Sequence, residues 1–235
     1  MTDALWSAME ATWPAVQRLR AGPWLVREGQ GGGGRVSSIT AEDAWTEADI
    51  PAAEAAARDF GQPAVFMIRP GEDRLDAALA ARGYAVKDPV LVMTADLAKL
   101  PDPDCEFASF PHWPPLAVTR DIWAENGIGA ARLAVMARAG LPKTALLGRC
   151  QDRPAGAAFV ALSEGIAMLH ALDVANAFRR RGLGRDMVRS AAHWAREAGA
   201  SQLALLVTKA NTPARALYTG MGFALASAYH YRILP

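Results

Sequence analysis

The chain has 235 residues, of which 51% are hydrophobic, and its formal net charge is +1. This length suits one large domain or two small ones, and the balanced charge gives no electrostatic footprint for nucleic acid. The N-terminus lacks the basic and apolar segments of a signal peptide, and no apolar run approaches the ~20 residues of a membrane span. We therefore expect a cytoplasmic protein with neither nucleic acid nor membrane as a partner.

The first 40 residues alternate between helical and strand patterns. Residues 3–19 place apolar side chains on one side of a helix, which Pro14 splits or ends. Strands are expected at 24–27 and 35–39, on either side of the glycine run 31–34. A hairpin turn is the simplest interpretation of four successive glycines.

Domain boundaries are indicated by prolines, which crowd residues 101–115 and stiffen a connection. We expect a first domain over 1–100 and a second over 116–235. The second domain begins with two short helices between 116 and 139, where Trp123 either lines an acceptor pocket or belongs to the core. Three elements precede the connection: an alanine-rich helix at 50–60, a buried strand at 65–68 and a helix at 73–82.

A glycine-rich loop joins a strand to a helix in the second domain. Residues 167–174 are short and mostly apolar, as in a buried strand, and residues 183–198 have helical spacing that ends at Gly199. The first turn of a helix has free N–H groups and the positive end of the dipole, so glycines there favour phosphate binding. The loop consists of Arg179, Arg180, Arg181, Gly182, Leu183, Gly184 and Arg185.

Taken alone, this loop has an alternative interpretation as a glycine turn capped by solvated arginines. Two better-known phosphate motifs are missing from the sequence. It has no P-loop, and the spacing Gly-x-Gly lacks the third glycine of a dinucleotide fingerprint.

The last part of the chain continues the alternation. A second buried strand at 201–207 is followed by a helix that begins at Asn211 with Pro213 near its first position, and Gly222 ends it. Residues 223–233 return as a strand. This strand either stays at a sheet edge and pairs with a second chain or is covered within one chain, so a monomer and a homodimer both remain open.

This order of elements resembles the GNAT family of acyl-CoA N-acyltransferases over about residues 143–235. The glycine loop is similar to the family's cofactor loop through Arg179-x-x-Gly182-x-Gly184. The last helix is similar to that of the family through Asn211-x-x-Ala214-x-x-x-Tyr218-x-x-x-Gly222-Phe223. The resemblance implies an α/β fold (α+β, with a mixed sheet) and an acetyl-CoA site.

The resemblance also implies roles for individual residues. Backbone N–H groups from Arg180 to Arg185 would hold the pyrophosphate. Asn211, with Ala214 of the same motif, would contact the pantetheine arm. The arm would also pair, like an added strand, with the backbone of Leu172, Asp173 and Val174. A backbone N–H near Val174 would polarise the thioester carbonyl.

Tyr218 would stand near the thioester sulfur. A phenol with a pKa of about 10 can protonate the leaving thiolate at neutral pH. The alternative is a core tyrosine with a single buried hydrogen bond.

The base that takes the amine proton is not identified by the sequence. His170, Asp173 and Glu164 are candidates, and an ordered water is the alternative to all three. Strand alternation predicts that His170, Leu172 and Val174 share one face while Asp173 lies on the other. Glu164 lies in an expected hairpin turn, where a solvated carboxylate is usual. His170 is therefore the leading candidate.

No metal site is predicted, because the histidines are scattered and the cysteines have no paired spacing. We expect both cysteines to be free apolar residues. The residues concerned are His112, His170, His193, His230, Cys105 and Cys150.

The first half of the chain also has a faint similarity to the second half, at a shift of 139 residues. Residues 65–68 then overlie 204–207, and Leu79 overlies Tyr218. Such a repeat suggests tandem copies of one unit, of which the first is degenerate. The alternative is a generic α/β domain with chance similarity. At this shift the loop residues Arg179, Gly182 and Gly184 are matched by Thr40, Asp43 and Trp45.

Three functions follow from these observations. The first is an N-acetyltransferase that moves the acetyl group of acetyl-CoA to a primary amine, on a small molecule or a peptide, by direct attack in a ternary complex. The second is an acyl-CoA-binding sensor or scaffold without catalysis. The third, a dinucleotide-dependent oxidoreductase, would need an acidic residue ~20 positions after the loop, whereas Val207-Thr208-Lys209 ends that strand.

Overall fold

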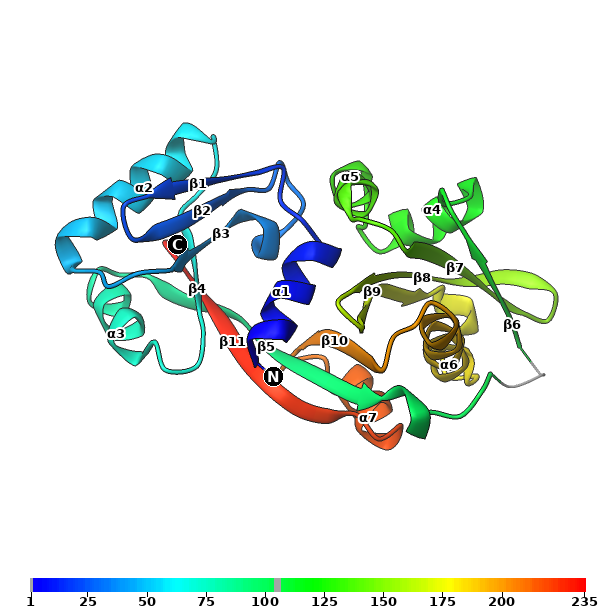
Figure 1. Cartoon of the computed structure of the whole chain (residues 1–235). Coiled ribbons are helices and arrows are strands. Elements are labelled where there is room, and N and C mark those ends of the chain that lie inside the picture. Colours follow the sequence, from blue (N-terminus) through cyan, green and yellow to red (C-terminus); the bar gives the residue numbers. More distant parts are fainter. Residues whose placement is uncertain (1, 104–106) are drawn as a thin grey trace. The chain divides into compact units, whose positions relative to one another are not determined.

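The computed structural model describes residues 2–103 and 107–235 (Figure 1). Cys105 and part of the expected proline-rich connection lie outside the described residues. The chain divides into two compact units. Unit 1 contains the residues up to Trp13, Val92–Val207 and Asn211–Ala226, and unit 2 contains Pro14–Leu91, Thr208–Ala210 and Ser227–Pro235.

The units are not consecutive stretches of sequence, in contrast to the boundaries expected near 100 and 116. The N-terminal helix belongs to unit 1, and the C-terminal strand belongs mostly to unit 2. Two long strands, β5 (Ala85–Asp96) and β11 (Ala224–Ile233), contribute residues to both units. Each unit therefore takes part of its sheet from the other half of the chain.

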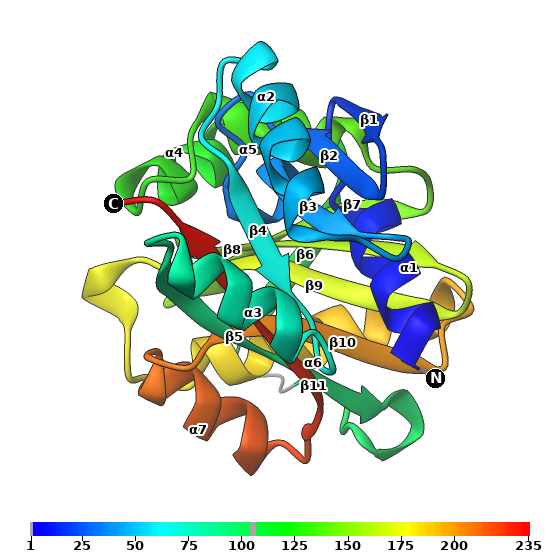
Figure 2. The same cartoon turned by 90° about the vertical axis from the view of Figure 1, so that its left-hand side faces the viewer.

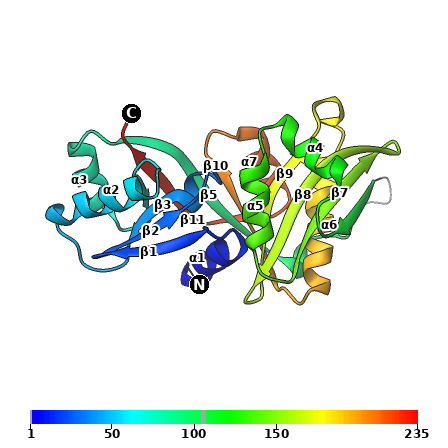
Figure 3. The ribbon, with the colours of Figure 1, turned by 90° about the horizontal axis from the view of Figure 1, so that it is seen from above.

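Unit 1 is a mixed α/β unit with the strand order β5-β10-β9-β8-β7-β6. The pairs β6–β7, β7–β8 and β8–β9 are antiparallel, and β9–β10 is parallel. The helices α1 and α4 contact β8 and β9 (Figure 3). Its elements are α1 (Thr2–Thr12), β6 (Ala108–His112), α4 (Ala117–Glu125), α5 (Ala130–Arg138), β7 (Lys143–Cys150), β8 (Arg153–Ser163), β9 (Ile166–Val174), α6 (Leu183–Glu197), β10 (Gln202–Thr208) and α7 (Thr212–Gly220).

Two glycines let α6 approach the sheet closely. A Cβ built on Gly148 of β7 or on Gly156 of β8 would lie 2.7 or 2.4 Å from the sulfur of Met187. Phe159, three residues after Gly156 on the same strand, instead contacts Trp13, which follows α1. Because side chains alternate along a strand, α6 and α1 cover opposite faces of β8.

Unit 2 has the strand order β1-β2-β3-β4-β11-β5. The pairs β1–β2, β2–β3 and β4–β11 are antiparallel, and β3–β4 is parallel. Helix α3 packs on β4, and α2 packs on β1 and β2 (Figure 2). The elements are β1 (Gln17–Ala21), β2 (Trp24–Glu28), β3 (Ser38–Ala41), α2 (Ile50–Asp59), β4 (Val65–Ile68) and α3 (Asp73–Ala81). Because β11 pairs with β4, it is covered within the chain.

The N-terminal segment differs from its sequence prediction. The first helix ends at Thr12, before Pro14, and residues 17–21 form a strand that pairs with β2 across a turn at Gly22, whose φ is +60°. The strand expected at 35–39 begins only at Ser38, because a 3₁₀ helix occupies Gly34–Ser37. Arg18 and Arg20 made the first strand hard to recognise, since β1 is almost entirely exposed and carries no apolar alternation.

The order β-α-β-α-β occurs twice along the chain. It runs through β3-α2-β4-α3-β5 and again through β9-α6-β10-α7-β11. Helix α3 begins 139 residues before α7, but α2 begins 133 residues before α6. The shorter length of α2, 10 residues against 15 in α6, accounts for five of these six residues. A constant shift of 139 therefore fails before α2. At the shift of 133 residues that relates the starts of α2 and α6, the N-cap Asp49 falls opposite the N-cap Gly182, whereas a shift of 139 places Asp43 there.

An ion-pair cluster in unit 2 joins α3 to β11. Asp76 accepts hydrogen bonds from Arg232 at 2.7 and 3.0 Å and lies 2.6 Å from His230 Nε2. The bonds from Arg232, and then those from His230, lower the pKa of Asp76 to about 2. Since this folded-state pKa lies below that of an unfolded aspartate, the stabilisation is complete above about pH 4 and is lost as the pH falls toward 2.

We therefore expect Asp76→Asn to destabilise the protein at pH 5 by roughly 1–2 kcal/mol, and by much less at pH 2.5. The measurement is the thermal midpoint of each variant at both pH values. Asp73→Asn, on the same helix and exposed, is the matched control. A destabilisation by Asp76→Asn that is equal at both pH values would contradict the prediction.

No helix within the described residues is both long and apolar enough to cross a lipid bilayer.

Candidate functional site

The two parallel strands of unit 1 separate partway along their length. They pair in register from Gln202–Ile166 to Leu205–Leu169. Beyond Leu169, β9 continues to Val174 and β10 to Thr208 without further pairing among the described residues. Beyond Leu169 this side of β9 therefore faces no strand among the described residues, an arrangement that suits pairing with an extended ligand.

A β-bulge lies in β9 just past the last pair with β10. Phe159 of β8 pairs with His170, whereas Ala157 pairs with Asp173, so β9 has one extra residue in this interval. Ala171 has a φ of +50°, which a non-glycine residue adopts only at a cost. The bulge therefore lies next to the point where β9 and β10 separate.

The bulge also corrects the prediction about faces. Residues directly opposite each other on antiparallel strands point to the same side of the sheet. Since Ala157 and Phe159 are two residues apart, their partners Asp173 and His170 share a face. Strict alternation predicted opposite faces, and the extra residue at Ala171 reverses that result.

Side chains from outside the sheet hold the end of β9. Trp123 of α4 is fully buried and donates its indole N–H to the Ala171 carbonyl at 2.8 Å, so it belongs to the core. Asp173 accepts a 2.6 Å hydrogen bond from Asn126 and lies 3.5 Å from the guanidinium of Arg179. Arg179 also donates to the Val174 carbonyl at 2.8 Å. The carboxylate of Asp173 is thus engaged by Asn126 and Arg179. Because these contacts stabilise its charged form, it is a poor base.

The glycine loop leads directly into α6. Gly182 is the N-cap, with φ +95°, and Arg180 has φ +64°. The N–H groups of Arg185 and Asp186 both donate to the Gly182 carbonyl, at 2.9 and 3.2 Å. The N–H of Arg185 is therefore already engaged.

The N–H groups of Leu183 and Gly184 have no acceptor among the described residues. These donors point from the positive end of a 15-residue helix. The exposed side chains of Arg180 and Arg185 add positive charge beside them. An anion is the ligand that this arrangement favours.

The loop, the end of β9 and helix α7 meet at one point. A Cβ placed on Gly184 would lie 3.8 Å both from Val174 of β9 and from Leu217 of α7. Tyr218 is the next residue along α7. At the start of that helix, Asn211 accepts a 3.2 Å hydrogen bond from the Ala214 N–H, which makes Asn211 the N-cap. The capping oxygen is thereby occupied, while the exposed side chain keeps its amide donors.

The environment of Tyr218 keeps its phenol in the neutral form. It is 8% exposed, and its ring packs against Phe223 with centroids 5.7 Å apart. Burial raises the pKa of Tyr218 to about 12, because the charged phenolate would lose its hydration. The phenol therefore stays protonated at neutral pH.

His170 is the first residue of β9 beyond the last pair with β10. It is 4% exposed, and its ring centroid lies 4.9 Å from that of Trp13 and 6.0 Å from that of Phe159. Its Nε2 lies 3.0 Å from the hydroxyl of Thr12 in α1. The ring therefore stands in a fixed orientation where the strands begin to separate. No sequence signal linked residue 12 to residue 170.

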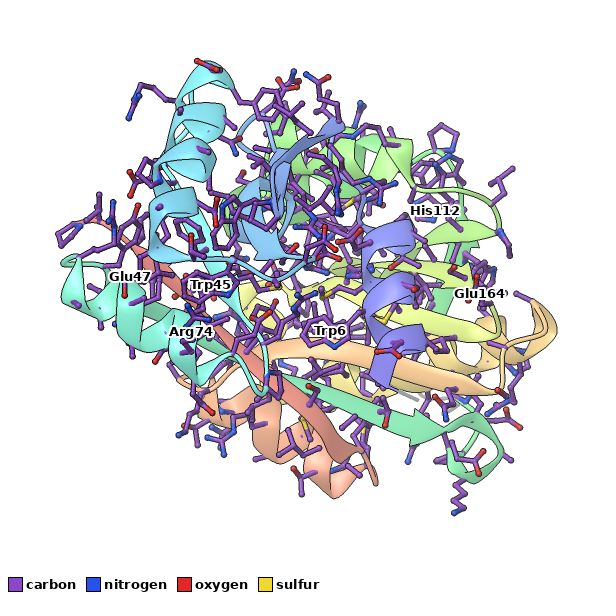
Figure 4. The ribbon with its side chains drawn as sticks, turned by 60° about the vertical axis from the view of Figure 1, so that its left-hand side comes forward. Trp6, Trp45, Glu47, Arg74, His112 and Glu164 are labelled. Atoms are coloured by element: carbon purple, nitrogen blue, oxygen red, sulfur yellow. The ribbon has the colours of Figure 1, made fainter. Side chains whose placement is uncertain are left out.

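The other candidates lie elsewhere. Glu164 is in the turn between β8 and β9 with φ +49°, at the opposite end of β9 from the glycine loop (Figure 4). Cys150 is buried and free, as expected. Within residues 2–103 and 107–235, no group of three or more His, Cys, Asp or Glu side chains is arranged to hold a metal ion.

Two parallel strands of unit 2 also separate, but a side chain lies between their ends. Strands β3 and β4 pair at Ser38–Val65 and Ile39–Phe66 and then separate, as β9 and β10 do. The guanidinium of Arg69, just after β4, donates to the Ala41 carbonyl at the end of β3. It also contacts Glu72 at 2.8 Å and Glu42 at 3.3 Å. A side chain of the protein thus occupies the gap between these strand ends.

Helix α2, which follows β3 in unit 2, has a carboxylate at its N-cap, whereas the N-cap of α6 is a glycine. Asp49, its N-cap, accepts hydrogen bonds from the backbone N–H and the hydroxyl of Thr46, both at 2.8 Å. These bonds lower the pKa of Asp49. The resulting negative charge disfavours an anion at this helix end.

A groove of about 510 Å³ in unit 2 lies beside Trp45, whose ring is covered by the Arg74 guanidinium at 4.6 Å (Figure 4). Its carboxylates are largely neutralised by arginines, since Asp43 pairs with Arg20, and Arg69 pairs with both Glu42 and Glu72.

The sequence profile described as the acetyltransferase (GNAT) family matches residues 100–223, more than half of the chain. The chain belongs to the GNAT acetyltransferase family. It is an N-acetyltransferase, and the proteins of this family use acetyl-CoA and act on amine acceptors. The matched residues include all of the glycine loop, β9, α6, β10 and α7.

Relatives of this GNAT enzyme agree with the assignment. An uncharacterized N-acetyltransferase, YobR, from Bacillus subtilis (strain 168) is 28% identical over 240 residues, which cover 95% of this chain and 94% of YobR. A streptothricin acetyltransferase from Streptomyces lavendulae is 49% identical over 53 residues, or 23% of this chain and 28% of that protein. A GCN5-related N-acetyltransferase from Kribbella flavida shares the fold with a TM-score of 0.72 at 17% identity, covering 99% of this chain and 93% of that one.

Proposed function

We propose that this GNAT enzyme transfers the acetyl group of acetyl-CoA to a primary amine by direct attack in a ternary complex. The observation that carries the proposal is the separation of β9 from β10 beyond Leu169, which leads to the anion-binding end of α6 and to the helix of Tyr218. All of these groups belong to unit 1. An extended ligand with a diphosphate at one end and a thioester near its other end matches this arrangement.

The residues of the loop and of β9 fit acetyl-CoA in three ways. The N–H groups of Leu183 and Gly184 are available for the diphosphate, with Arg180 and Arg185 beside them. The backbone of residues 172–174 is available for the pantetheine arm, although the Val174 carbonyl is taken by Arg179. The absence of a Cβ at Gly184 keeps open the space between the loop and α7.

Acetyl-CoA supplies a thioester, whose carbonyl carbon is attacked by the neutral amine nitrogen with cleavage of the C–S bond. We assign Tyr218 as the acid that gives its proton to the leaving sulfur, because its pKa of about 12 keeps it protonated. We assign His170 as the base that takes the proton lost by the amine nitrogen. Asp173 is excluded from that role by its bonds to Asn126 and Arg179.

We further propose that the chain is a tandem of two GNAT-like copies and that the first copy is degenerate. The repeated order β-α-β-α-β and the separation of β3 from β4 support this view. The first copy has Arg69 between its strand ends, Asp49 at its helix N-terminus and Leu79 where α7 has Tyr218. Each change removes one part of the acetyl-CoA site.

These two proposals together predict one acetyl-CoA per chain. Isothermal titration calorimetry of the whole protein with acetyl-CoA should give a single site, and titration with NAD as the control should give no heat of binding. A stoichiometry of two would contradict the degeneracy of the first copy. If acetyl-CoA does not bind, the proposed function is wrong.

The amine acceptor can be identified by screening amines and measuring the free thiol of CoA that acetyl transfer releases. Streptothricin is the first amine to test, because one relative is named for its acetylation. Small polyamines and lysine-containing peptides complete the first screen.

A further inference from the structure

We propose that Asn126 of α4 and Arg179 of the glycine loop are positioning residues, which act through Asp173 to hold the end of β9 in the geometry that binds the pantetheine arm. This role rests on the proposed function, in which acetyl-CoA pairs with the backbone of residues 172–174. It gives α4 a part in cofactor binding, although this helix belongs neither to the glycine loop nor to β9.

The three side chains form a small polar network that joins α4, β9 and the loop. The side-chain amide of Asn126 donates to Asp173 Oδ2 at 2.6 Å. Nη2 of Arg179 lies 3.5 Å from Asp173 Oδ1 and 3.4 Å from Asn126 Oδ1. The guanidinium is therefore almost equally close to an oxygen of each partner, and each side chain contacts the other two.

Arg179 also holds the backbone of β9 directly. Its Nε donates to the Val174 carbonyl at 2.8 Å, so one loop side chain contacts the last two residues of the strand. The side chain of Asp173 is only 11% exposed. Hydrogen bonds to a charged group are strong, and the exclusion of water strengthens them further.

The end of β9 needs such support because β10 pairs with it only as far as Leu169, and because Ala171 has a φ of +50°. Helix α4 holds this strand end at two places (Figure 3). Trp123 donates to the Ala171 carbonyl, and Asn126, three residues later and at the end of the helix, donates to Asp173. A strand that already has its bound geometry binds an extended ligand more tightly, because binding then orders no backbone.

The charges of the network provide a sharp test. It contains one guanidinium, one carboxylate and one amide, so the single carboxylate can be moved from position 173 to position 126 by a reciprocal exchange. Because Arg179 is almost equally close to both positions, it can pair with the carboxylate at either one. Two carboxylates would repel each other, and with none the guanidinium would lose its ion pair.

The measurement is calorimetric titration of the whole protein with acetyl-CoA. Asn126→Asp alone places two carboxylates in contact and should raise the Kd roughly tenfold. Asp173→Asn alone leaves Arg179 without a carboxylate and should raise the Kd roughly threefold or more. The variant with both substitutions has one carboxylate again, and its Kd should return to within about twofold of that of the wild type.

Kinetics separate the positioning of acetyl-CoA from a role in the reaction. With the fastest amine of the screen, each single variant should raise the KM for acetyl-CoA and keep kcat within about twofold of the wild-type value. Asp102→Asn is the matched control, because Asp102 forms an ion pair with Arg196 in the last turn of α6. This control also removes a carboxylate from an arginine of unit 1, and it should change neither Kd nor kcat.

The proposal is overturned if the doubly substituted variant binds acetyl-CoA no better than the weaker single variant. Unchanged Kd values in both single variants, an equal loss in Asp102→Asn, or a fall in kcat as large as the rise in KM would overturn it too. If Asn126→Asp does not fold, Asn126→Ala removes the contact without adding charge. Its Kd should rise about threefold, and an unchanged value would count against the proposal. Failure of acetyl-CoA to bind the wild type would instead overturn the proposed function, so the two failures are distinguishable.

Discussion

Gly182→Asp should abolish binding of acetyl-CoA while the chain remains folded. The substitution places a carboxylate at the N-cap of α6, next to the N–H groups of Leu183 and Gly184. Two like charges about 4 Å apart repel by about 4 kcal/mol near a protein surface. We expect the affinity for acetyl-CoA to fall at least about 100-fold. Calorimetric titration measures the affinity, and circular dichroism reports the fold.

The control for this variant is Gly182→Asn, because both substitutions strain the backbone. Gly182 has a φ of +95°, and an added Cβ would lie 3.4 Å from the ring of Phe107. Asparagine has the size and the strain of aspartate without its charge. Affinity in Gly182→Asn should therefore remain well above that in Gly182→Asp. Equal losses in the two variants would show that backbone geometry, rather than charge, is what the loop contributes.

Tyr218→Phe should lower kcat about tenfold or more and leave the affinity for acetyl-CoA nearly unchanged. The phenol hydroxyl is the only group removed, and the ring can keep its packing against Phe223. A general acid acts on the transition state, so its loss appears in kcat rather than in binding. Stopped-flow or steady-state release of CoA gives kcat, and calorimetry gives the affinity.

The pH dependence of the wild type checks the same assignment. With a pKa of about 12, Tyr218 remains a proton donor up to about pH 11. We therefore expect no decline in kcat from ionisation of Tyr218 below that pH. If the Tyr218→Phe variant keeps the wild-type kcat, Tyr218 is a core residue, which is the alternative that its burial also allows.

Much of the fold was accessible to sequence analysis because hydrophobic periodicity is local. The helix at 183–197, the strand at 166–174 and the Asn-led helix that begins at Thr212 lie within two residues of their expected positions. The first strand, 17–21, was not recognised, because an exposed strand has no apolar alternation to reveal it. The bulge at Ala171 was not recognised either, since it depends on the pairing between β8 and β9.

The two compact units are each built from non-consecutive segments of the chain. Proline density at 101–115 suggested two consecutive domains, but compact units form wherever strands pair, regardless of their order in the chain. The pairing of β11 with β4 brings the C-terminal residues into unit 2, and α1 packs on β8 and β9 of unit 1. Neither contact leaves a trace in composition or spacing.

The sequence by itself determined the family, the glycine loop and the helix of Tyr218, because each is a short segment whose residues act through their own local backbone. Tertiary structure decided which side chains surround the end of β9. It brought Asp173 into contact with Asn126 and Arg179. It also placed the indole N–H of Trp123 against the carbonyl of Ala171 in the bulge. It also joined Thr12 to His170 across 158 residues of sequence. Such contacts arise from packing between distant elements, and no local pattern encodes them.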